Sequence, residues 1–529
     1  MAQFLNHIYK KVFSTVHNSK ENVPINANDN KKRVAIIGAG VSGVAGAAHL
    51  KAAGIDVVVF ERNSVAGGVW VFDERKPIEP PYPSVDASLP ESEYPGQWGD
   101  NAVKESAPTD GYDIDEVNLR HAPPGPCYAS LMNNISTPLL QLKVNSFPPK
   151  TPDYVNHKVL EEYIQDTAQK TGVDELILYN TNVDNAEKED GKWWLSTSTL
   201  KSGKKVAQNW KFDTLVIASG HYHACNVPDI PGLSEWKARW PERIQHSKGY
   251  RRPLEFKDKN VLLIGAGVSS TDIARDVAPI ANQIYQVSRN GPFDLPASFL
   301  PVGATRIGEI ASFEKPPGKV DNSLATDQAI PSSVALKNGT KLENIHNVIV
   351  CTGYHCSYPF LRTYHSNKTP TEPASDTVLV TDGIQTHNLH KDIFYIPDPT
   401  LAFIGVPYFT ATFTLFEFQA IVLAAILSGK ASLPTEEDMR TEYRQRMAEK
   451  GTGKAFHSLK NQEVEYVDQL MDWINTDGRK LGVKPIEGHT KEWHEANVDR
   501  MEKLRLRMEA KNGDEVERLN NLAKDRHIL

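Results

Sequence analysis

Cysteine is scarce in this chain of 529 residues. The four cysteines, Cys127, Cys225, Cys351 and Cys356, form no Cys-x-x-Cys pair. Dithiol redox chemistry of the thioredoxin type and the common zinc sites both need such pairs, so neither is expected, and no histidine pair indicates a metal site. Few and scattered cysteines are typical of a reducing compartment, which predicts a cytoplasmic protein.

The chain also lacks a surplus of basic residues and any long apolar run. It has 59 Lys and Arg against 66 Asp and Glu, a net charge of −7, which argues against a nucleic-acid partner. The longest apolar run, Ala420 to Leu427, is far shorter than the ~18 residues that a membrane span needs. The composition is that of a globular protein, and the length predicts two or three domains.

The two ends of the chain show no catalytic pattern. Residues 1–20 contain three lysines and no acid, and their apolar side chains would share one face of a helix. We interpret this helix as a packing element in an N-terminal extension, residues 1–31; contact with a membrane surface and a targeting role are the alternatives. Residues 434–529 are charged and helical in pattern, and are expected to pack on the preceding domain or to join subunits of a homo-oligomer.

A glycine-rich turn follows the extension. Arg33–Ile37 is a short β-branched run typical of a buried parallel strand. An alanine-rich helix, Val44–Ala53, and a second strand, Ile55–Phe60, come after the turn, and Glu61 ends the strand. This is the complete strand–turn–helix–strand setting of a dinucleotide-binding motif. The turn consists of Gly38, Ala39, Gly40, Val41, Ser42 and Gly43.

The residues of this turn have separate roles in such a motif. Gly38 makes the tight turn, Gly40 lets a pyrophosphate approach the backbone, and Gly43 lets the helix pack closely on the strand. The phosphates would lie at the helix N-terminus, where amides and the helix dipole favour an anion. Glu61 stands where an acid accepts a hydrogen bond from a ribose 2′-hydroxyl.

The same motif occurs a second time. Ile264 to Ser269 repeats Ile37 to Ser42, but Ser270 replaces the third glycine and Ser288, followed by Arg289, stands in the place of Glu61. A carboxylate would repel a 2′-phosphate, whereas a hydroxyl and a guanidinium favour one. We therefore assign FAD to the first motif and NADPH to the second, with hydride passing between them. The residues expected at the second site are Gly265, Gly267, Ser269, Ser270, Thr271, Asp272, Ser288 and Arg289.

Further motifs follow in an order that resembles the flavin-containing monooxygenases, in particular the soluble fungal type, from about Lys32 to Leu433. These motifs are AGGVW (66–70), YASLMNN (128–134), NHKVLEEY (156–163), IASGHY (217–222), VIVCTGYHCSYPF (348–360) and FEFQA (416–420). The resemblance implies that the FAD site includes Gly68, Val69, Trp70, Asn133, Asn134 and Gln419.

The signature segment of that family matches least well. The segment WPERIQHSKGY, Trp240 to Tyr250, keeps the signature histidine, His246, and the terminal tyrosine. Trp240 replaces a phenylalanine, and Glu242 replaces a glycine, which requires Glu242 to adopt an ordinary backbone conformation. The terminal tyrosine favours this family over the related Baeyer–Villiger enzymes, whose version of the segment resembles it but ends in tryptophan.

The resemblance implies an FAD-dependent NADPH monooxygenase of the N,N-dimethylaniline monooxygenase type. NADPH would reduce FAD, O2 would add to give a C4a-hydroperoxide, and a soft nitrogen or sulfur of a small molecule would take the distal oxygen. The hydroperoxide is the reagent, so the protein must mainly position it and exclude water. Asn134 is implied as the catalytic residue, because a neutral amide can donate a hydrogen bond at the flavin without acting as an acid.

These inferences predict an α/β fold of two Rossmann-like domains, the second inserted into the first, with a helical C-terminal region. The FAD domain would comprise residues 32–224 and 344–433, and the NADPH domain residues 225–343. Residues 73–125 are rich in Pro, Asp, Ser and Glu and form an insertion, either a solvated excursion or a wall of the substrate path.

Three other functions stay open at this stage. A Baeyer–Villiger oxygenation would use the same intermediate on a ketone, and an uncoupled NADPH oxidase would release only peroxide. A cofactor-binding protein without turnover is the third, although the intact nucleotide motifs speak against it. The sequence does not identify the substrate.

Overall fold

The first sheet of the computed structural model forms the centre of the protein. The structure describes residues 32–84, 86–94, 114–315, 323–367, 369–372 and 374–509, so the predicted helix in residues 1–20 lies outside the described residues. Within the described residues this sheet has seven strands in the order β18–β19–β20–β7–β1–β2–β3, parallel except at the β18 and β19 edge. The strands are β1 (Arg33–Ile37), β2 (Asp56–Phe60), β3 (Ile177–Leu178), β7 (Thr214–Ile217), β18 (Leu389–His390), β19 (Phe394–Tyr395) and β20 (Leu401–Phe403).

Apolar layers cover both faces of this sheet. In β1, Val34 and Ile36 pack against helices, while Ala35 and Ile37 pack into a second cluster formed with an antiparallel three-stranded sheet. Such two-sided burial explains why the strand has no polar alternation. The helices of this domain are α2 (Val41–Ala52), α4 (Thr137–Leu140), α5 (His157–Lys170) and α8 (Thr412–Leu427), and the three-stranded sheet is β4 (Thr181–Glu189), β5 (Lys192–Lys201) and β6 (Lys204–Phe212).

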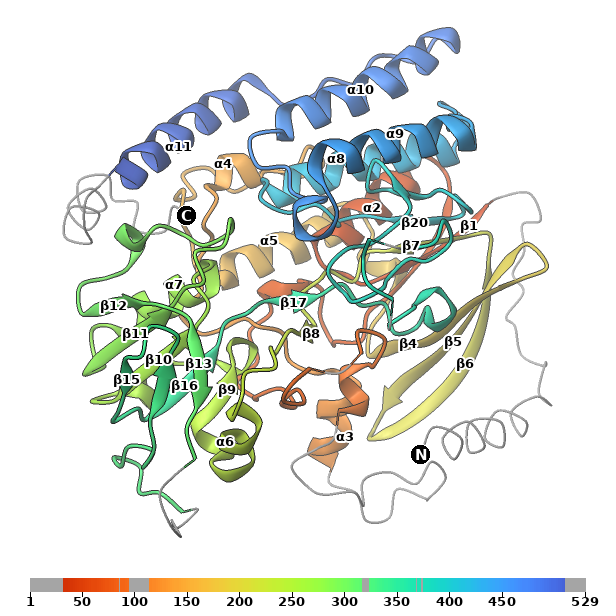
Figure 1. Cartoon of the computed structure of the whole chain (residues 1–529). Helices are drawn as coiled ribbons and strands as arrows, with labels where there is room; N and C mark the ends of the chain where they lie inside the picture. Colours follow the sequence, from red (N-terminus) through yellow and green to blue (C-terminus); the bar gives the residue numbers. More distant parts are fainter. Residues whose placement is uncertain are drawn as a thin grey trace.

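A second α/β unit lies beside the first (Figure 1). Its described part contains a fully parallel five-stranded sheet in the order β12–β11–β10–β16–β9. The strands are β9 (Ile244–His246), β10 (Asn260–Ile264), β11 (Gln283–Val287), β12 (Ala304–Ile307) and β16 (Asn347–Val350), with helices α6 (Leu233–Arg239) and α7 (Val268–Val277). A small antiparallel sheet of β13 (Ile310–Phe313), β14 (Val334–Leu336) and β15 (Lys341–Leu342) adjoins them.

The chain passes between the two units twice, and the two crossings pair with each other. Strands β8 (Ala224–Cys225) and β17 (Tyr354–His355) are antiparallel partners, with Tyr354 opposite Cys225. Because β16 belongs to the five-stranded sheet, the chain returns to the first unit only after this strand, whereas the sequence had placed the return before it, at residue 344.

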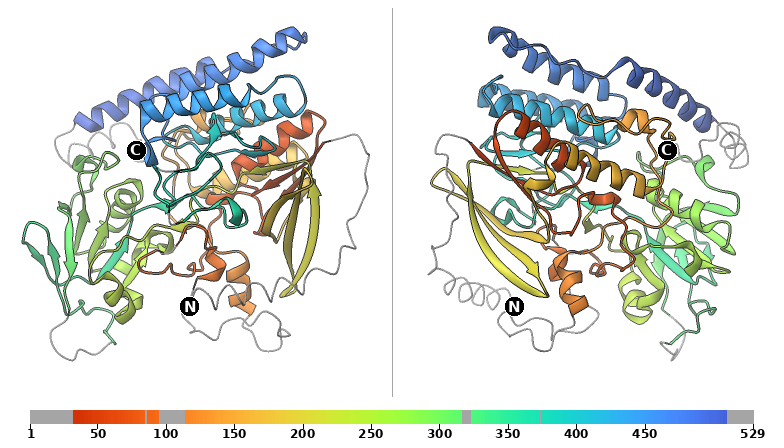
Figure 2. Two further views of the ribbon diagram at one scale, coloured as in Figure 1. Left: turned by 45° about the vertical axis from the view of Figure 1, so that its right-hand side comes forward. Right: turned by 180° about the vertical axis from the view of Figure 1, so that it is seen from behind.

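The C-terminal region consists of helices α9 (Glu436–Lys450), α10 (Glu463–Lys480) and α11 (Lys491–Glu509). Helix α10 packs on α8, and α11 contacts both α4 in the first unit and the turn η7 (Ala297–Phe299) in the second. Figures 1 and 2 show α10 and α11 running across one side of the molecule, above both units. None of the helices in the described part of the chain combines the length and the apolar character needed to cross a membrane.

The predicted fold class is confirmed: two Rossmann-like units and a helical C-terminal region are present. The predicted helix after the first turn begins at Val41 rather than Val44, because the last residues of the glycine turn already belong to the helix. The insertion contains the helix α3 (Ile114–His121) and the turn η2 (Glu91–Glu93), and its residues 95–113 lie outside the described residues.

Candidate active site

Both glycine turns open into one cavity of about 3570 Å³. Many of the residues predicted for the two nucleotide sites line it: Gly38, Gly40, Val41, Ser42, Glu61, Gly68, Val69, Trp70, Asn134, Gly265, Gly267, Ser269, Asp272 and Arg289. Seven predicted residues are absent from this lining: Ala39, Gly43, Asn133, Ser270, Thr271, Ser288 and Gln419. The structure therefore brings the two motifs together at one cavity. The seven absent residues lie behind the lining.

The first turn has the backbone that a bound pyrophosphate requires. Gly38 has φ +104°, and a Cβ there would lie 2.6 Å from the Ala218 carbonyl oxygen. A Cβ on Gly43 would lie only 1.8 Å from the Gly38 carbonyl oxygen, so the helix could not approach the strand with any larger residue. Helix α2 begins without a side-chain cap, which leaves its first amides directed at the cavity edge as anion donors.

Glu61 is buried at the end of β2 and holds the turn in shape. One carboxylate oxygen accepts a hydrogen bond from the Ala39 amide at 2.8 Å. The other accepts from the backbone and side-chain nitrogens of Asn63, at 2.8 and 2.9 Å. Glu61 also lines the cavity, and its hydrogen bond to the ribose of FAD stays a prediction.

The second turn differs from the first where its sequence differs. Gly265 has φ +113°, but Ser270 fits where the first turn has Gly43. The Ser270 hydroxyl donates to the Gly267 carbonyl at 3.0 Å and accepts from Gln286 at 2.8 Å, and Gln286 also donates to Thr271 at 3.2 Å. Ser270 and Thr271 therefore attach α7 to β11 rather than face the cavity.

A carboxylate stands beside Ser288, which the sequence reasoning missed. The Ser288 hydroxyl donates to Asp294 at 2.6 Å and accepts from the Asn290 amide at 2.9 Å. Arg289 is exposed and lines the cavity, and its role beside a 2′-phosphate stays a prediction. The second motif has no acid at the end of its strand, but Asp294, in the loop that follows, places a carboxylate beside Ser288. The pattern of the strand does not predict this position.

The two neighbouring asparagines have different surroundings. Asn134 lines the cavity, and within the described part of the chain its side chain makes no hydrogen bond. Asn133 is fully buried: its amide nitrogen donates to the carbonyls of Ile135 and Asp153, at 2.7 and 2.8 Å, and its oxygen accepts from Val155 at 2.6 Å. Asn133 was expected to line the cofactor junction, but it fastens the backbone beneath Asn134.

Gln419 also supports the cavity from behind. Its side-chain oxygen accepts from the Gly405 amide at 2.9 Å, and its nitrogen donates to the Tyr466 hydroxyl at 2.9 Å. Gly405 lines the cavity with φ +99°, and a Cβ there would lie 2.6 Å from the Ser42 hydroxyl. Gln419 therefore positions a loop that closes on the first glycine turn.

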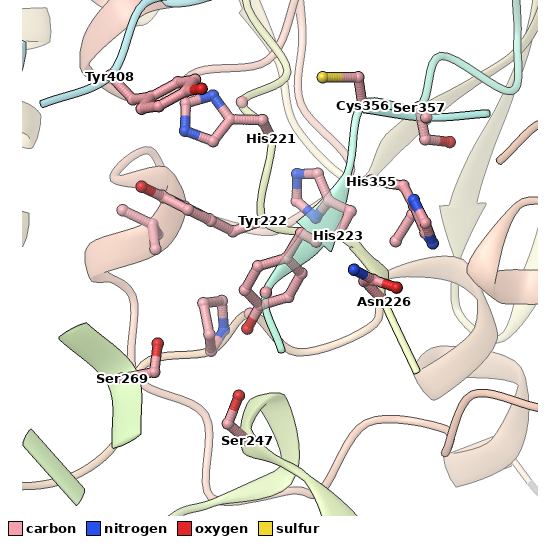
Figure 3. A pocket seen from close by; sticks show the side chains of 18 of the residues that line it. His221, Tyr222, His223, Asn226, Ser247, Ser269, His355, Cys356, Ser357 and Tyr408 are labelled. Carbon is pink, nitrogen blue, oxygen red and sulfur yellow. The ribbon is translucent and has the colours of Figure 1, made fainter. Parts of the chain in front are cut away.

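Histidine and tyrosine side chains from the two crossing segments form one wall of the cavity (Figure 3). The rings of His221 and Tyr222 lie 4.4 Å apart, and Tyr222 contacts Tyr354 at 5.4 Å. Burial lowers the pKa of His221 to about 4 and that of His223 to about 3, so both are neutral at physiological pH. In the described residues no group of His, Cys, Asp and Glu could hold a metal ion.

The described part of the insertion reaches this cavity. Residues 89–94 line it, and the buried carboxylate of Glu91 forms an ion pair with the buried ammonium of Lys248. Lys248 also donates to the His223 carbonyl at 3.1 Å, and Arg62 donates to the His223 ring at 2.9 Å. Residues 89–94 are therefore part of the cavity wall and not a solvated excursion.

The signature segment supports the crossing between the two units. His246 is fully buried; its ring donates to the Gly353 carbonyl at 3.2 Å and accepts from the Lys248 amide at 3.2 Å. The Tyr250 hydroxyl donates to Asp276 in α7 at 2.5 Å. Glu242 is exposed in a short 3₁₀ turn with an ordinary backbone, as expected, and Trp240 is buried against Trp236.

The C-terminal region contributes lining residues that the sequence reasoning did not foresee. They are Lys454, His457, Lys460, Asn461, Arg500, Met501, Leu504 and Met508. The quoted motifs gave no signal for them, because the last of these motifs ends at residue 420, and Arg500, Met501, Leu504 and Met508 reach the cavity only because α11 folds across both units.

Two glycine turns that share one cavity define a two-nucleotide oxidoreductase of the Rossmann type. The sequence matches the flavin-binding monooxygenase-like family over residues 123–299 and 318–485, and an NAD(P)-binding Rossmann-like domain over residues 36–83. The chain belongs to the flavin-binding monooxygenase-like family. Its cofactors are FAD and NADPH, with O2 as the co-substrate, and the predicted family is confirmed.

Relatives in fungi and a solved plant structure agree with this assignment. The chain is 43% identical to the flavin-containing monooxygenase ustF2 of Aspergillus flavus, over 91% of this chain and 99% of that protein. It is 32% identical to the flavin-containing monooxygenase iboF of Amanita muscaria, over 86% and 90%. The structure of S-allyl-L-cysteine S-oxygenase from Allium sativum superposes with a TM-score of 0.61 at 24% identity, covering 94% of this chain and 98% of that one, and shows the shared fold.

Proposed function

We propose that the protein uses NADPH and O2 to oxygenate a soft nucleophilic nitrogen or sulfur of a small molecule. The observation that carries the proposal is that both nucleotide turns and the unpaired amide of Asn134 line one cavity. When bound, FAD would take hydride from NADPH and supply activated oxygen for transfer to the substrate. The chain's own residues would bind and orient the two nucleotides and keep water from the reacting atoms.

The protonation state of two cavity-lining histidines supports this role. Asn134 can donate a hydrogen bond to an acceptor on the flavin without supplying a proton that would release peroxide. His221 and His223 line the same cavity, and burial lowers both pKa values, so neither is a ready acid at pH 7. Neutral histidines on this wall remove one source of the proton that loss of peroxide requires, which favours oxygen transfer to a nucleophile.

The test is anaerobic reduction of the purified flavoprotein by NADPH, followed by rapid mixing with O2. We expect a near-ultraviolet absorbance that persists before the oxidised flavin spectrum returns, and one oxygenated product per NADPH with a thioether or a tertiary amine. Immediate reoxidation with one peroxide per NADPH, with and without these substrates, would identify an NADPH oxidase. An ester formed from a ketone, with no product from the amine or thioether, would identify a Baeyer–Villiger enzyme.

A further inference from the structure

A cation from the C-terminal region lies beside the second nucleotide turn. Lys454 is carried by the short turn η9 (Gly453–Ala455), and its ammonium lies 5.0 Å from the ring centroid of Phe293. Phe293 in turn stacks on Phe409, with centroids 5.7 Å apart and planes within 3°. All three side chains line the cavity, so a lysine from outside the nucleotide domain faces the loop that follows β11.

That loop is the one that carries Asp294. The Leu295 amide donates to the Ala266 carbonyl at 2.8 Å, so the loop crosses directly over the second glycine turn. Asp294 accepts the Ser288 hydroxyl at 2.6 Å, and its charge acts on Lys454. Ser288, Arg289 and Asp294 therefore lie at the end of β11, where a Rossmann domain distinguishes a ribose hydroxyl from a 2′-phosphate, and Lys454 faces the same loop from the C-terminal region.

The two charges of this group have opposite preferences. A carboxylate accepts a ribose 2′-hydroxyl and repels a 2′-phosphate, and the Asp294 carboxylate alone would favour NADH. Arg289 makes no ion pair or hydrogen bond within the described residues, and Lys454 has only its contact with the Phe293 ring and the charge of Asp294. Two cations with unused hydrogen-bond donors outweigh one acid, so the net charge of the group is positive and favours a phosphate.

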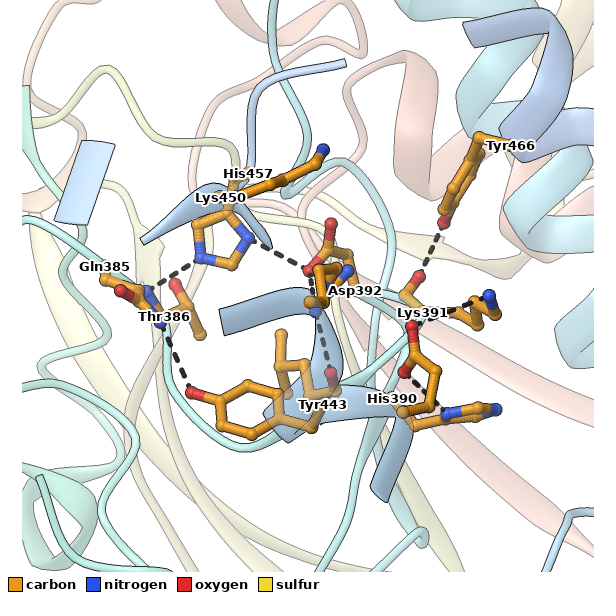
Figure 4. Close-up of polar contacts among 12 residues, drawn as sticks. Gln385, Thr386, His390, Lys391, Asp392, Tyr443, Lys450, His457 and Tyr466 are labelled. Atoms are coloured by element: carbon orange, nitrogen blue, oxygen red, sulfur yellow. Dashed lines mark hydrogen bonds and ion pairs between the residues drawn. The ribbon is translucent and has the colours of Figure 1, made fainter. Parts of the chain in front are cut away.

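The position of Lys454 is fixed by buried contacts on both sides of η9. The Gly453 amide donates to Gln385 at 2.7 Å, and Gln385 donates to Tyr443 at 3.3 Å. His457, after η9, donates to buried Asp392 at 2.9 Å and accepts from the Thr386 amide at 3.1 Å. Figure 4 shows this network of polar contacts, which holds the turn in place against the hairpin of β18 and β19.

We propose that Lys454 is a specificity-determining residue for the nicotinamide coenzyme: together with Arg289 it binds the 2′-phosphate of NADPH and offsets Asp294. The C-terminal region would then complete the coenzyme site. The second nucleotide unit presents Arg289 and Asp294 to the cavity there, while its Arg306, which also interacts with Asp294, is hydrogen-bonded to Gln286 and the Leu295 carbonyl. This inference concerns the binding of the coenzyme alone. It does not depend on which atom of the substrate is oxygenated.

Calorimetric titration of the full-length FAD-loaded protein tests the inference. The probes are 2′,5′-ADP and 5′-AMP, which differ only in the 2′-phosphate and cannot react. We expect Lys454→Gln to weaken 2′,5′-ADP binding about 10-fold, the loss of one charge-assisted contact, and to leave 5′-AMP within about 2-fold. Asp294→Asn should act in the opposite direction and strengthen 2′,5′-ADP. Lys430→Gln removes the charge of an exposed lysine that follows α8 and lies outside the cavity; it is the charge-matched control and should change neither affinity.

Several results would overturn the proposal. If Lys454→Gln weakens the binding of both probes equally, Lys454 only supports the fold. If neither affinity changes, Lys454 does not bind the 2′-phosphate, and its charge would serve another ligand, such as a substrate carboxylate. If Lys454→Gln fails to retain FAD, Asp294→Asn decides: an unaltered ratio of the two affinities rejects the inference. Lys454→Arg should preserve the preference for 2′,5′-ADP, since it keeps the charge.

Discussion

At the scale of single residues, Asn134 is the side chain on which the proposed chemistry depends. We expect Asn134→Ala to keep FAD and to bind NADP⁺ normally, because its side chain holds no backbone group in the described residues. Loss of one hydrogen-bond donor at the flavin should speed the return of oxidised flavin about 10-fold and raise the peroxide yield. Stopped-flow absorbance and a peroxide assay measure the two effects.

The neighbouring asparagine gives a matched comparison with a different outcome. Asn133→Ala would leave the Ile135 carbonyl and the Val155 amide without their Asn133 partner, while the Asp153 carbonyl would keep its hydrogen bond from the Thr137 amide. We expect the free energy of unfolding to fall by about 2–4 kcal/mol, from unsatisfied buried polar groups. Denaturant unfolding measures this loss. If Asn133→Ala were stable and Asn134→Ala were not, the assignment of the two roles would be wrong.

These two residues also show what a sequence can predict at this scale. The motif identified the pair, but which of two adjacent side chains faces the cavity depends on the backbone partners that Asn133 finds in residues 153–155. Asp294 could not be predicted at all, since its proximity to Ser288 comes from a loop conformation and not from strand register.

At the scale of elements, the two glycine turns can be compared directly, because they differ at the position of the third glycine. A Cβ on Gly43 would lie 1.8 Å from a backbone oxygen that cannot move independently, whereas the second turn already carries Ser270 at the same place. We expect Gly43→Ala to displace α2 from β1 and to lower FAD occupancy at least about 10-fold after purification. The ratio of flavin to protein absorbance reads the outcome.

The control for this substitution is Ser270→Ala in the second turn. It removes the hydroxyl that Gln286 contacts but adds no atom to the turn, so FAD content should stay at the level of the unaltered protein. Flavin content that is normal in Gly43→Ala would refute the close-packing role of the third glycine.

Most of these elements were predictable because periodicity and turn chemistry are local. The first strand, Arg33–Ile37, and the helix that follows match the prediction closely. The return from the second unit was placed too early, because β16 is as apolar as a strand of the first sheet and only hydrogen bonding to β10 and β9 shows where it belongs.

At the scale of the whole molecule, the C-terminal region turns two nucleotide units into one site. Helix α11 contacts both units, and its indole at Trp493 donates to the Leu139 carbonyl at 3.3 Å. The charge pattern predicted exposed helices, and much of α11 is exposed, but mixed charge along a helix gives no information about which surface the helix crosses. The part of the cavity wall contributed by Arg500, Met501, Leu504 and Met508 follows from that tertiary placement alone.

Buried neutral histidines link the stability of the molecule to pH. Burial lowers the pKa of His246 to about 3 and that of His387 to about 4, and both side chains are almost fully buried. An unfolded histidine titrates near pH 6.5, so the unfolded chain takes up these protons first as the pH falls. The contribution of each buried neutral histidine to the free energy of unfolding is complete above about pH 6.5. It falls by about 1.4 kcal/mol per pH unit as the pH decreases toward 4.

His387→Gln isolates one of these contributions. The variant should be less stable than the unaltered protein at pH 7, since the contact of His387 with the Thr381 hydroxyl at 3.2 Å is disturbed. Between pH 6 and 5 its free energy of unfolding should fall less steeply, by about 1.4 kcal/mol per pH unit, because one proton fewer is taken up on unfolding. Acidic groups such as Asp272, whose pKa burial raises to about 6, contribute equally to both proteins and cancel in the difference. Parallel curves from urea unfolding at the two pH values would show that His387 titrates normally in the folded protein.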